Sequence, residues 1–239
     1  MIKDIDCFIL CGGYGKRLKK ITGRIPKPMV CFGKRPFLDI LIDHLHKFGC
    51  KRFILGTGYN ADFIKKYYNL NKYPGREIIF STENKPLGTG GAVRKAKKLI
   101  LSKHFLVING DTFSDFNLKN FVKFSKQKKA KVLMLLRKEN NNKDYGFVVT
   151  NPKSEIESYS EKKSPKSEGF INSGVYLFSR EVFSMMPKKS VFSLEYDFFP
   201  KIIGNGVYGY KGKGFFIDIG TPERYLVAKK YFLKRRDIN

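Results

Sequence analysis

The chain has 239 residues, of which 42% are hydrophobic and 28% charged, enough apolar material for a sizeable core and too much for a disordered chain. No apolar run approaches the ~18 residues of a membrane span, and the polar, partly acidic start is untypical of a secretory signal, so we expect a cytoplasmic protein with no membrane partner. Lys and Arg number 47 against 21 Asp and Glu, a net charge of +26 that indicates a polyanionic partner of unspecified kind.

The first half of the chain alternates apolar runs with helical patterns. Strands are predicted at 7–10, 53–55, 78–80, 105–108 and 132–136. Helices are predicted between Pro36 and Gly49, at 61–68 with Asn60 as the cap, and at 92–99 and 118–128. Strand–helix alternation of this kind indicates a parallel sheet covered on both faces, because parallel neighbours need crossover connections.

The second half is more polar and richer in turns. Strands are predicted at 147–150 and 175–178, and helices at 180–186, at 195–203 and from Pro222 onward. There is no hexapeptide array, so an appended β-helix domain is not expected. Four cysteines, Cys7, Cys11, Cys31 and Cys50, form neither C-x-x-C pairs nor a metal spacing, which indicates free thiols in a reducing compartment.

A glycine-rich turn follows the first strand. Gly12, Gly13 and Gly15 would let backbone N–H groups approach a phosphate, and Arg17 and Lys27 would add fixed positive charge. The turn is neither a P-loop, which needs Ser or Thr after the lysine, nor a dinucleotide fingerprint, which needs a third spaced glycine at the position of Leu18. Glycines alone would predict a plain tight turn, but with the two cations phosphate binding is favoured.

A second glycine-rich segment begins at Glu83 and runs into a helix. Its glycines would let a flat base lie against the backbone, and Glu83 could accept hydrogen bonds from a base edge that carries donors. Guanine offers two adjacent donors, N1–H and the N2 amine. A helix N-terminus with a solvated glutamate explains the segment equally well, so its residues leave both readings open.

Two carboxylates end apolar strands. Asp111 closes Asn109-Gly-Asp111, at the end of a strand where open α/β sheets place their ligands, and Asp218 lies just before the last predicted helix. Mg²⁺ prefers a couple of acidic oxygens together with substrate phosphates. Each Asp alone would be read as a cap, but the pair beside a phosphate loop favours a metal site.

Weaker candidates come from the second half. Glu161 with Lys162, and Asn172 in the segment that ends at Gly174, could bind a polar, phosphorylated second substrate. Without outside help a charged loop and a strand end are the stronger reading. The three histidines have no metal spacing, and no Ser-centred nucleophile elbow is found.

Taken in order along nearly the whole chain, these segments resemble the sugar-1-phosphate nucleotidyltransferases. Within that family the chain is most similar to the short guanylyltransferases that act on D-glycero-D-manno-heptose 1-phosphate. The resemblance implies an α/β Rossmann-like fold with a mixed, mostly parallel central sheet and helices on both faces. It also implies a Mg²⁺-dependent reaction in which an NTP, GTP being favoured, and a sugar 1-phosphate give an NDP-sugar and pyrophosphate for surface polysaccharide synthesis.

The resemblance assigns roles to matching positions. Catalytic roles fall to Arg17, Lys27 and Asp111, and the Mg²⁺ ligands would be Asp111 and Asp218. The nucleotide site would be formed by Leu10, Gly12, Gly13, Gly15, Lys16, Glu83, Leu87 and Gly88. The sugar phosphate site would be formed by Asn109, Gly146, Glu161, Lys162, Asn172 and Gly174. Residues 1–239 would be one domain, with a nucleotide-binding half at 1–137 and a sugar-phosphate-binding half with the C-terminal helix at 138–239.

Some positions depart from the family pattern, and alternatives stay open. Cys11 stands where many relatives carry Ala, and the segment at Glu83 lacks the glutamine usual in thymidylyltransferases, which disfavours dTTP. A thymidylyl-, uridylyl- or cytidylyltransferase on another sugar phosphate is one alternative, and a basic nucleic-acid-binding protein is another. The expected partners are an NTP and a sugar 1-phosphate; nucleic acid is not expected, and a homodimer is left open.

Overall fold

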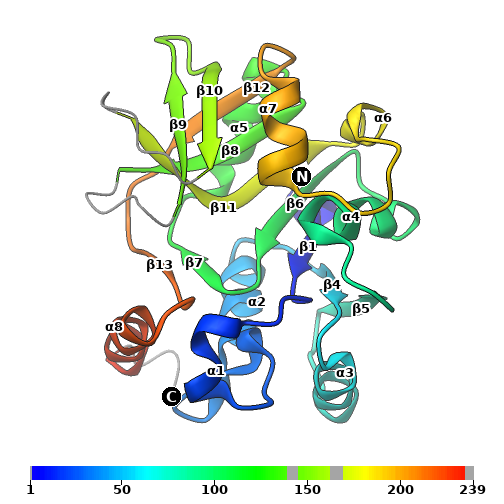
Figure 1. The fold of residues 1–239 in the computed structure, drawn as a ribbon, viewed down its shortest axis with the longest axis vertical. Coiled ribbons are helices and arrows are strands. Elements are labelled where there is room, and N and C mark those ends of the chain that lie inside the picture. Colours follow the sequence, from blue (N-terminus) through cyan, green and yellow to red (C-terminus); the bar gives the residue numbers. More distant parts are fainter. Residues whose placement is uncertain (1, 139–144, 162–168, 235–239) are drawn as a thin grey trace.

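The computed structural model describes residues 2–138, 145–161 and 169–234 (Figure 1). Its centre is one nine-stranded sheet, of which four neighbouring strands are parallel. In spatial order these are β6 (His104–Asn109), β1 (Asp6–Leu10), β4 (Arg52–Thr57) and β5 (Glu77–Thr82). All four carry the apolar runs expected of strands covered on both faces.

The rest of the sheet is organised around the long strand β11 (Phe170–Ser179). It pairs antiparallel with β6, with β8 (Val132–Arg137) and with β9 (Gly146–Thr150). Outside these lie β10 (Ile156–Glu161), antiparallel to β9, and β12 (Val207–Lys211), parallel to β8. The sheet is therefore mixed, as predicted, with its antiparallel part in the second half of the chain.

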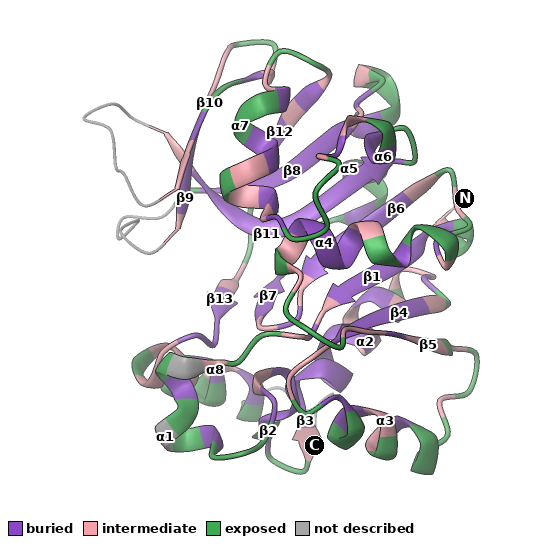
Figure 2. Cartoon of the chain, turned by 45° about the vertical axis from the view of Figure 1, so that its right-hand side comes forward, coloured by how far each residue is buried: buried purple, intermediate pink, exposed green. Residues whose placement is uncertain are grey.

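Helices cover both faces of the sheet, and the strands between them are buried (Figure 2). One apolar cluster packs the sheet against α2 (Phe37–Lys47), α3 (Ala61–Leu70) and α5 (Leu118–Lys128). The opposite cluster includes α4 (Gly88–Lys95), α6 (Val182–Met185) and α7 (Phe199–Ile202). The α/β class with two covered faces is confirmed.

A third apolar cluster lies beyond the main sheet. It brings together two short ladders, β2 (Cys31–Phe32) with β3 (Arg35–Pro36) and β7 (Thr112–Ser114) with β13 (Phe216–Asp218). The C-terminal helix α8 (Pro222–Leu233) covers them, near the short helix α1 (Lys19–Thr22) in Figure 1. Because β13 pairs with β7, the end of the chain returns to the segment that follows β6.

The structure differs from the predicted elements at three helices, and it also contains strands that were not predicted from the sequence, namely β7, β10, β12 and the short β2–β3 ladder. Asn60 does not cap α3 with its side chain; its backbone is left-handed and its amide donates to the carbonyl of Arg24. The helix expected at 92–99 is α4, which gives way to a 3-10 turn at Ala96. The helix expected at 195–203 begins as a π-turn over Leu194–Phe198, in which Phe199 N donates to the carbonyl of Leu194, and continues as α7 with Pro200 in its first turn.

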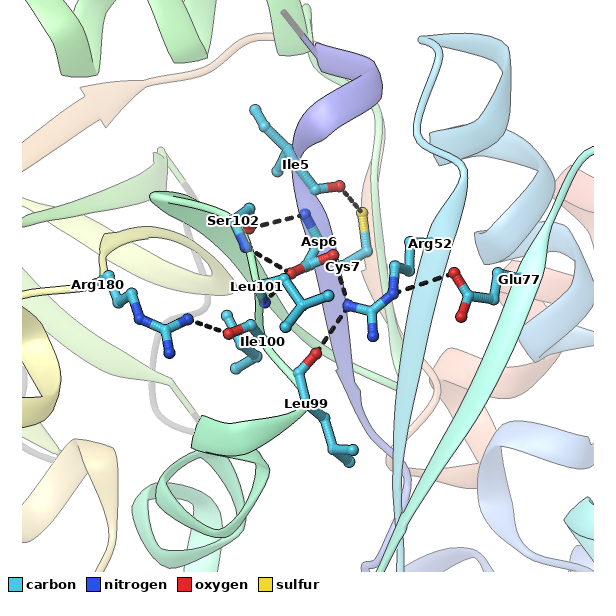
Figure 3. A network of polar contacts seen from close by, with 10 residues as sticks. All are labelled: Ile5, Asp6, Cys7, Arg52, Glu77, Leu99, Ile100, Leu101, Ser102 and Arg180. Carbon is cyan, nitrogen blue, oxygen red and sulfur yellow. Dashed lines mark hydrogen bonds and ion pairs between the residues drawn. The ribbon is translucent and has the colours of Figure 1, made fainter.

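A polar network closes the amino ends of the parallel strands (Figure 3). Arg52 at the start of β4 donates to the buried carboxylate of Asp6 at 2.9 Å and to the carbonyl of Leu99 at 2.7 Å. The backbone N–H groups of Leu101 and Ser102 donate to the other oxygen of Asp6. This network ties β1, β4 and the segment before β6 at the edge opposite their carboxyl ends.

In the part of the chain that the structure describes, no helix is long and apolar enough to cross a membrane. All four cysteines are free thiols; Cys7, Cys11 and Cys50 are buried and Cys31 is exposed.

Candidate active site

The glycine-rich turn after β1 runs close to another backbone segment. Cys11 N donates to the carbonyl of Gly56, and Tyr59 N donates to the carbonyl of Gly12. A Cβ on Gly12 would lie 3.3 Å from the backbone of Gly58, and Gly15 has a positive φ of 58°. Such backbone geometry favours glycine, so the turn is built from the residue type that the sequence supplies there.

This turn forms one wall of a cavity of about 310 Å³. The cavity opens at the carboxyl ends of β1 and β6, which is where an open α/β sheet binds its ligand. Its lining consists of Leu10, Cys11, Gly12, Gly13, Tyr14, Lys27, Pro28, Glu83, Pro86, Gly88, Thr89, Ala92, Asn109 and Asp111. Five of the eight predicted nucleotide residues are therefore brought together: Leu10, Gly12, Gly13, Glu83 and Gly88.

Glu83 is the first residue of the second glycine-rich segment and lines the first cavity. Its Oε2 accepts a hydrogen bond of 3.0 Å from Leu87 N. Burial raises the pKa of Glu83, and the Leu87 N–H and the charge of Lys95 oppose that rise. The carboxylate is thus held in the cavity wall by the backbone of the segment that precedes α4.

Lys27 and Asp111 meet on the floor of the cavity. The Lys27 Nζ lies 2.5 Å from Asp111 Oδ2, and the two side chains are 15% and 29% exposed. Burial alone would raise the pKa of Asp111, but the Lys27 ammonium and the Thr112 hydroxyl hold it below its ordinary value. Asp111 is therefore ionised at neutral pH, and it lines both this cavity and its neighbour.

A second cavity of about 260 Å³ adjoins the first. Both cavities share Thr89, Asn109 and Asp111 in their linings. The remaining lining residues are Arg17, Thr112, Tyr145, Gly146, Glu161, Asn172, Ser173, Gly174, Tyr176, Glu195, Phe216, Asp218 and Arg224. Every described residue predicted for the sugar phosphate site lines this second cavity, and so does Arg17.

A bulge in β11 shapes the floor of the second cavity. The pairing with β8 shifts register between Asn172 and Tyr176, and Gly174 within the bulge has a positive φ of 70°. Asn172 Oδ1 accepts from Gly174 N, and its Nδ2 donates to the hydroxyl of Tyr176. A Cβ on Gly174 would lie 2.4 Å from the amide of Asn109, so this position needs glycine on two grounds.

Asp218 lies beside Asp111 through the β7–β13 ladder. Asp218 is paired with Thr112, and Ile219 N donates to the carbonyl of Asp111 at 2.9 Å. The buried carboxylate of Asp218 accepts hydrogen bonds from Tyr145, from Gly220 N and, at 3.1 Å, from Arg224. Asp218 therefore caps a turn, as its residue type alone suggested, and also faces the second cavity.

The two carboxylates suit a Mg²⁺ ion that keeps substrate phosphates among its ligands. No group of three or more His, Cys, Asp or Glu side chains capable of holding a metal occurs among the described residues. An all-protein metal cage is therefore absent from that part of the chain. Asp111 lines both cavities and Asp218 lines the second, and two acidic residues so placed match the donor set that Mg²⁺ uses with phosphorylated ligands.

The remaining predicted residues lie elsewhere or outside the described part. Gly15 and Leu87 are near the first cavity but do not line it. Lys162 and the side chain of Lys16 fall outside what the structure describes. Sequence reasoning missed Thr89, Tyr145, Glu195 and Arg224 as lining residues. Thr89 and Arg224 could have been proposed from the sequence, because each lies in a segment that had already been singled out. Tyr145 and Glu195 lie in segments without a recognisable pattern.

Two adjoining cavities that share Asp111, the ion-pair partner of Lys27, at the carboxyl edge of a Rossmann-like sheet are the arrangement of a nucleotidyltransferase. The chain belongs to the nucleotidyl transferase family, whose model matches residues 7–235. The prediction of family and enzyme class is thereby confirmed.

Two relatives and one solved structure are similar to the chain over nearly their whole length. The D-glycero-alpha-D-manno-heptose 1-phosphate guanylyltransferase of Aneurinibacillus thermoaerophilus is 36% identical over 95% of this chain and 97% of its own length. The protein of the same name from Campylobacter jejuni is 34% identical, with 92% and 97% covered. The crystal structure of HddC from Yersinia pseudotuberculosis has a TM-score of 0.85 at 36% identity, covering 95% of this chain and 99% of HddC. HddC has also been crystallised as a complex with GMP-PN.

Proposed function

We propose that this enzyme transfers a guanylyl group from GTP to D-glycero-D-manno-heptose 1-phosphate, giving a GDP-sugar and pyrophosphate. The observation that carries the proposal is the Lys27–Asp111 pair, 2.5 Å between its charged atoms, of which Asp111 lines both cavities. A guanylyl donor and this sugar are supported by the names of the two relatives that match over nearly their whole length. The HddC complex with GMP-PN supports a guanine nucleotide.

The proposed reaction does not require a general base. A sugar phosphate oxygen is already an anionic nucleophile, and it forms a bond to the α-phosphorus of GTP while the bond to pyrophosphate breaks. The barrier arises from bringing two anions together and from the charge that grows on the leaving pyrophosphate. Fixed cations lower that barrier, and Lys27 is a cation in the wall of the first cavity that is held by Asp111, a residue common to both cavities.

In the nucleotide cavity, the glycine turn would hold the triphosphate through backbone N–H groups, with Gly15 and Lys16 completing the turn. Glu83 would accept from the guanine edge through the oxygen that does not bind Leu87 N. Guanine presents two adjacent donors to such a carboxylate, whereas thymine and uracil present one. Such a contact would favour GTP over dTTP or UTP.

In the second cavity, Glu161, Asn172 and the backbone at Gly146 and Gly174 would bind the sugar. Lys162 would bind its phosphate. Arg17 lines this cavity beside Asp218 and Arg224, and we assign to it the role that the resemblance implies, contact with the leaving pyrophosphate. Asp111 and Asp218 would hold Mg²⁺, which supplies further charge neutralisation on the phosphates when bound.

All four cysteines are free thiols, and this supports a cytoplasmic location for the enzyme. The product would serve surface polysaccharide synthesis. The homodimer stays a prediction.

The deciding experiment measures pyrophosphate release with GTP, ATP, UTP, CTP and dTTP, each against heptose, mannose, glucose and galactose 1-phosphates. We expect release with GTP and the heptose 1-phosphate, dependent on Mg²⁺ and absent when either substrate is left out. Faster release with another nucleotide would move the proposal to that nucleotide. No release with any pair, together with salt-sensitive binding to nucleic acid, would favour the basic nucleic-acid-binding alternative.

A further inference from the structure

Residues 87–91 of the second glycine-rich segment pack against a distant stretch of the chain, residues 190–195. Gly90 N and Gly91 N donate to the carbonyl of Phe192 at 3.0 and 3.1 Å, and Phe192 N donates to the carbonyl of Leu87 at 3.0 Å. A Cβ on Gly90 would lie 2.2 Å from the Phe192 ring, and one on Gly88 would lie 2.6 Å from the Phe192 carbonyl. These glycines are therefore required by the 190–195 stretch, whether or not a base also lies near them.

Thr89 is the residue with a polar side chain among residues 87–91, which contact the 190–195 stretch. Its hydroxyl donates to Glu195 Oε2 at 2.6 Å and accepts from Leu194 N at 2.8 Å. The hydroxyl of Ser193 donates to the same oxygen of Glu195, also at 2.6 Å. Two hydroxyl groups thus fix one carboxylate oxygen, and one of them belongs to the segment that begins at Glu83.

Glu195 faces the second cavity and not the first. Tyr176 lies on the same wall; burial raises its pKa well above the ordinary value, and the negative charge of Glu195 adds to the rise. At another part of this cavity, Arg17 and Arg224 lie close to Gly220 and Asp218. The cavity therefore has cations for a phosphate group and a held carboxylate elsewhere in its wall.

A carboxylate is an acceptor only, and a sugar hydroxyl is a donor that it can bind. With Oε2 of Glu195 bound by Thr89 and Ser193, and with the Tyr176 hydroxyl also hydrogen-bonded to this carboxylate, the orientation of Glu195 is fixed and Thr89 is one of the groups that fix it. We propose that Thr89 is a positioning residue for the sugar phosphate, holding Glu195 so that it accepts a hydrogen bond from a hydroxyl of the sugar ring. The inference rests on the proposed function and assigns to the glycine segment a role in sugar recognition.

The test separates the two substrates. Thr89→Val keeps the shape of the side chain and removes its hydroxyl, and we expect the KM for the heptose 1-phosphate to rise about 10-fold while the KM for GTP stays within about twofold. A loss of this size corresponds to one hydrogen bond to a charged group. Thr89→Ser retains the hydroxyl and is expected to restore the sugar phosphate KM to within about threefold of the original value.

The matched control is Thr150→Val. Thr150 lies in β9, lines neither cavity, and its buried hydroxyl oxygen has no hydrogen-bond partner. The same chemical change there removes no contact and is expected to leave both KM values unchanged. Glu195→Gln is the second arm, which also carries the test if Thr89→Val fails to fold: it is expected to raise the KM for the sugar phosphate alone.

Three results bear on the inference differently. Equal increases in both KM values, or none, in Thr89→Val would overturn the positioning role while leaving the proposed function intact. An unchanged sugar phosphate KM in Glu195→Gln would overturn it as well. Absence of pyrophosphate release by the unmodified enzyme with every sugar phosphate would overturn the proposed function itself, and this inference with it.

Discussion

The ammonium of Lys27 is held by Asp111 before any phosphate arrives, and Asp111 in turn is kept charged by that ammonium. This mutual arrangement places a cation in the wall of the first cavity, on a carboxylate that both cavities share, at little cost in reorganisation when the substrates bind. Electrostatic preorganisation of this kind is a large contribution to catalysis, because the dipoles and charges need not move as the transition state forms.

Removing that cation is expected to damage turnover more than binding. Lys27→Ala should lower kcat by about 10²–10³-fold, the size seen when one donor to a transition-state charge is lost, and it would leave Asp111 as an uncompensated negative charge beside the phosphates. The measurement is steady-state pyrophosphate release at saturating GTP and sugar phosphate. Near-normal kcat in this variant would contradict the role given to Lys27.

Glu83 illustrates a conflict between stability and function. Burial raises its pKa in the folded protein, so above that pKa the folded state carries a partly desolvated charge that the unfolded chain keeps in water. The cost is present above the folded pKa and disappears as the pH falls below the ordinary glutamate value of about 4.3. Stability therefore gains from neutralising this residue at neutral pH but not in acid.

Glu83→Gln is accordingly expected to raise Tm at pH 7.5, with the gain vanishing near pH 4, and to lower kcat/KM for GTP by about 10²-fold as the acceptor for the guanine donors is weakened. Thermal unfolding at the two pH values and initial rates with GTP check the two halves. A lower Tm at pH 7.5 together with unchanged GTP kinetics would reject the assignment of this carboxylate to the base.

At the scale of elements, the bulge in β11 decides where the second cavity lies. Between Asn172 and Tyr176 the strand carries extra residues relative to β8, and the displaced backbone brings Gly174 against Asn109. A regular strand would alternate its side chains between the two faces. The irregularity is thus what turns an ordinary central strand into part of a binding site.

Gly174→Ala should destabilise the protein by about 2 kcal/mol, from strained left-handed backbone and from the clash with Asn109. It should also raise the KM for the sugar phosphate. Gly204→Ala is the matched control, because Gly204 has a φ of 81° but no atom within 4 Å of the position that a methyl group would take. Equal losses of Tm in the two variants would show that the clash at Asn109 contributes nothing.

Much of this arrangement could be predicted from the sequence. Apolar runs such as 105–108 and Asp111 at the end of one of them identify a parallel strand and its functional edge, since both depend on local pattern alone. The bulge, the π-turn before Pro200 and the contact between Thr89 and Glu195 could not be found in this way. They depend on which distant segments meet, and no local pattern in the sequence encodes that.

At the scale of the whole molecule, the two edges of the parallel strands have separate tasks. The cavities lie at the carboxyl ends of the strands, whereas the Asp6–Arg52 network ties their amino ends (Figure 3). Changes in the network are therefore expected to alter stability without altering catalysis. The net charge of +26 is likewise distributed beyond the site, because the cavities use only a handful of the 47 basic residues.

Arg52→Leu should lower the free energy of unfolding by about 3 kcal/mol, since it leaves the buried carboxylate of Asp6 without its cation. Glu77→Gln removes the other ion pair of Arg52, but Glu77 is 62% exposed and we expect a loss below about 1 kcal/mol. Denaturant unfolding measures both, and kcat/KM should stay within about twofold in each. A large loss of activity in Arg52→Leu at a temperature where it remains folded would contradict the separation of tasks.

The position of β11 has a consequence for how the chain is made. It is the shared antiparallel neighbour of β6 and β8, yet β7, α5, β8, β9 and β10 all separate it from β6 along the sequence. A chain that leaves the ribosome from its N-terminus therefore carries β6 and β8 without their shared partner β11 until residue 179 has emerged. Strand edges left unpaired in this way invite pairing between nascent chains. Slower synthesis at lower temperature, or a holdase chaperone, should accordingly increase the yield of folded enzyme more than any change at the active site.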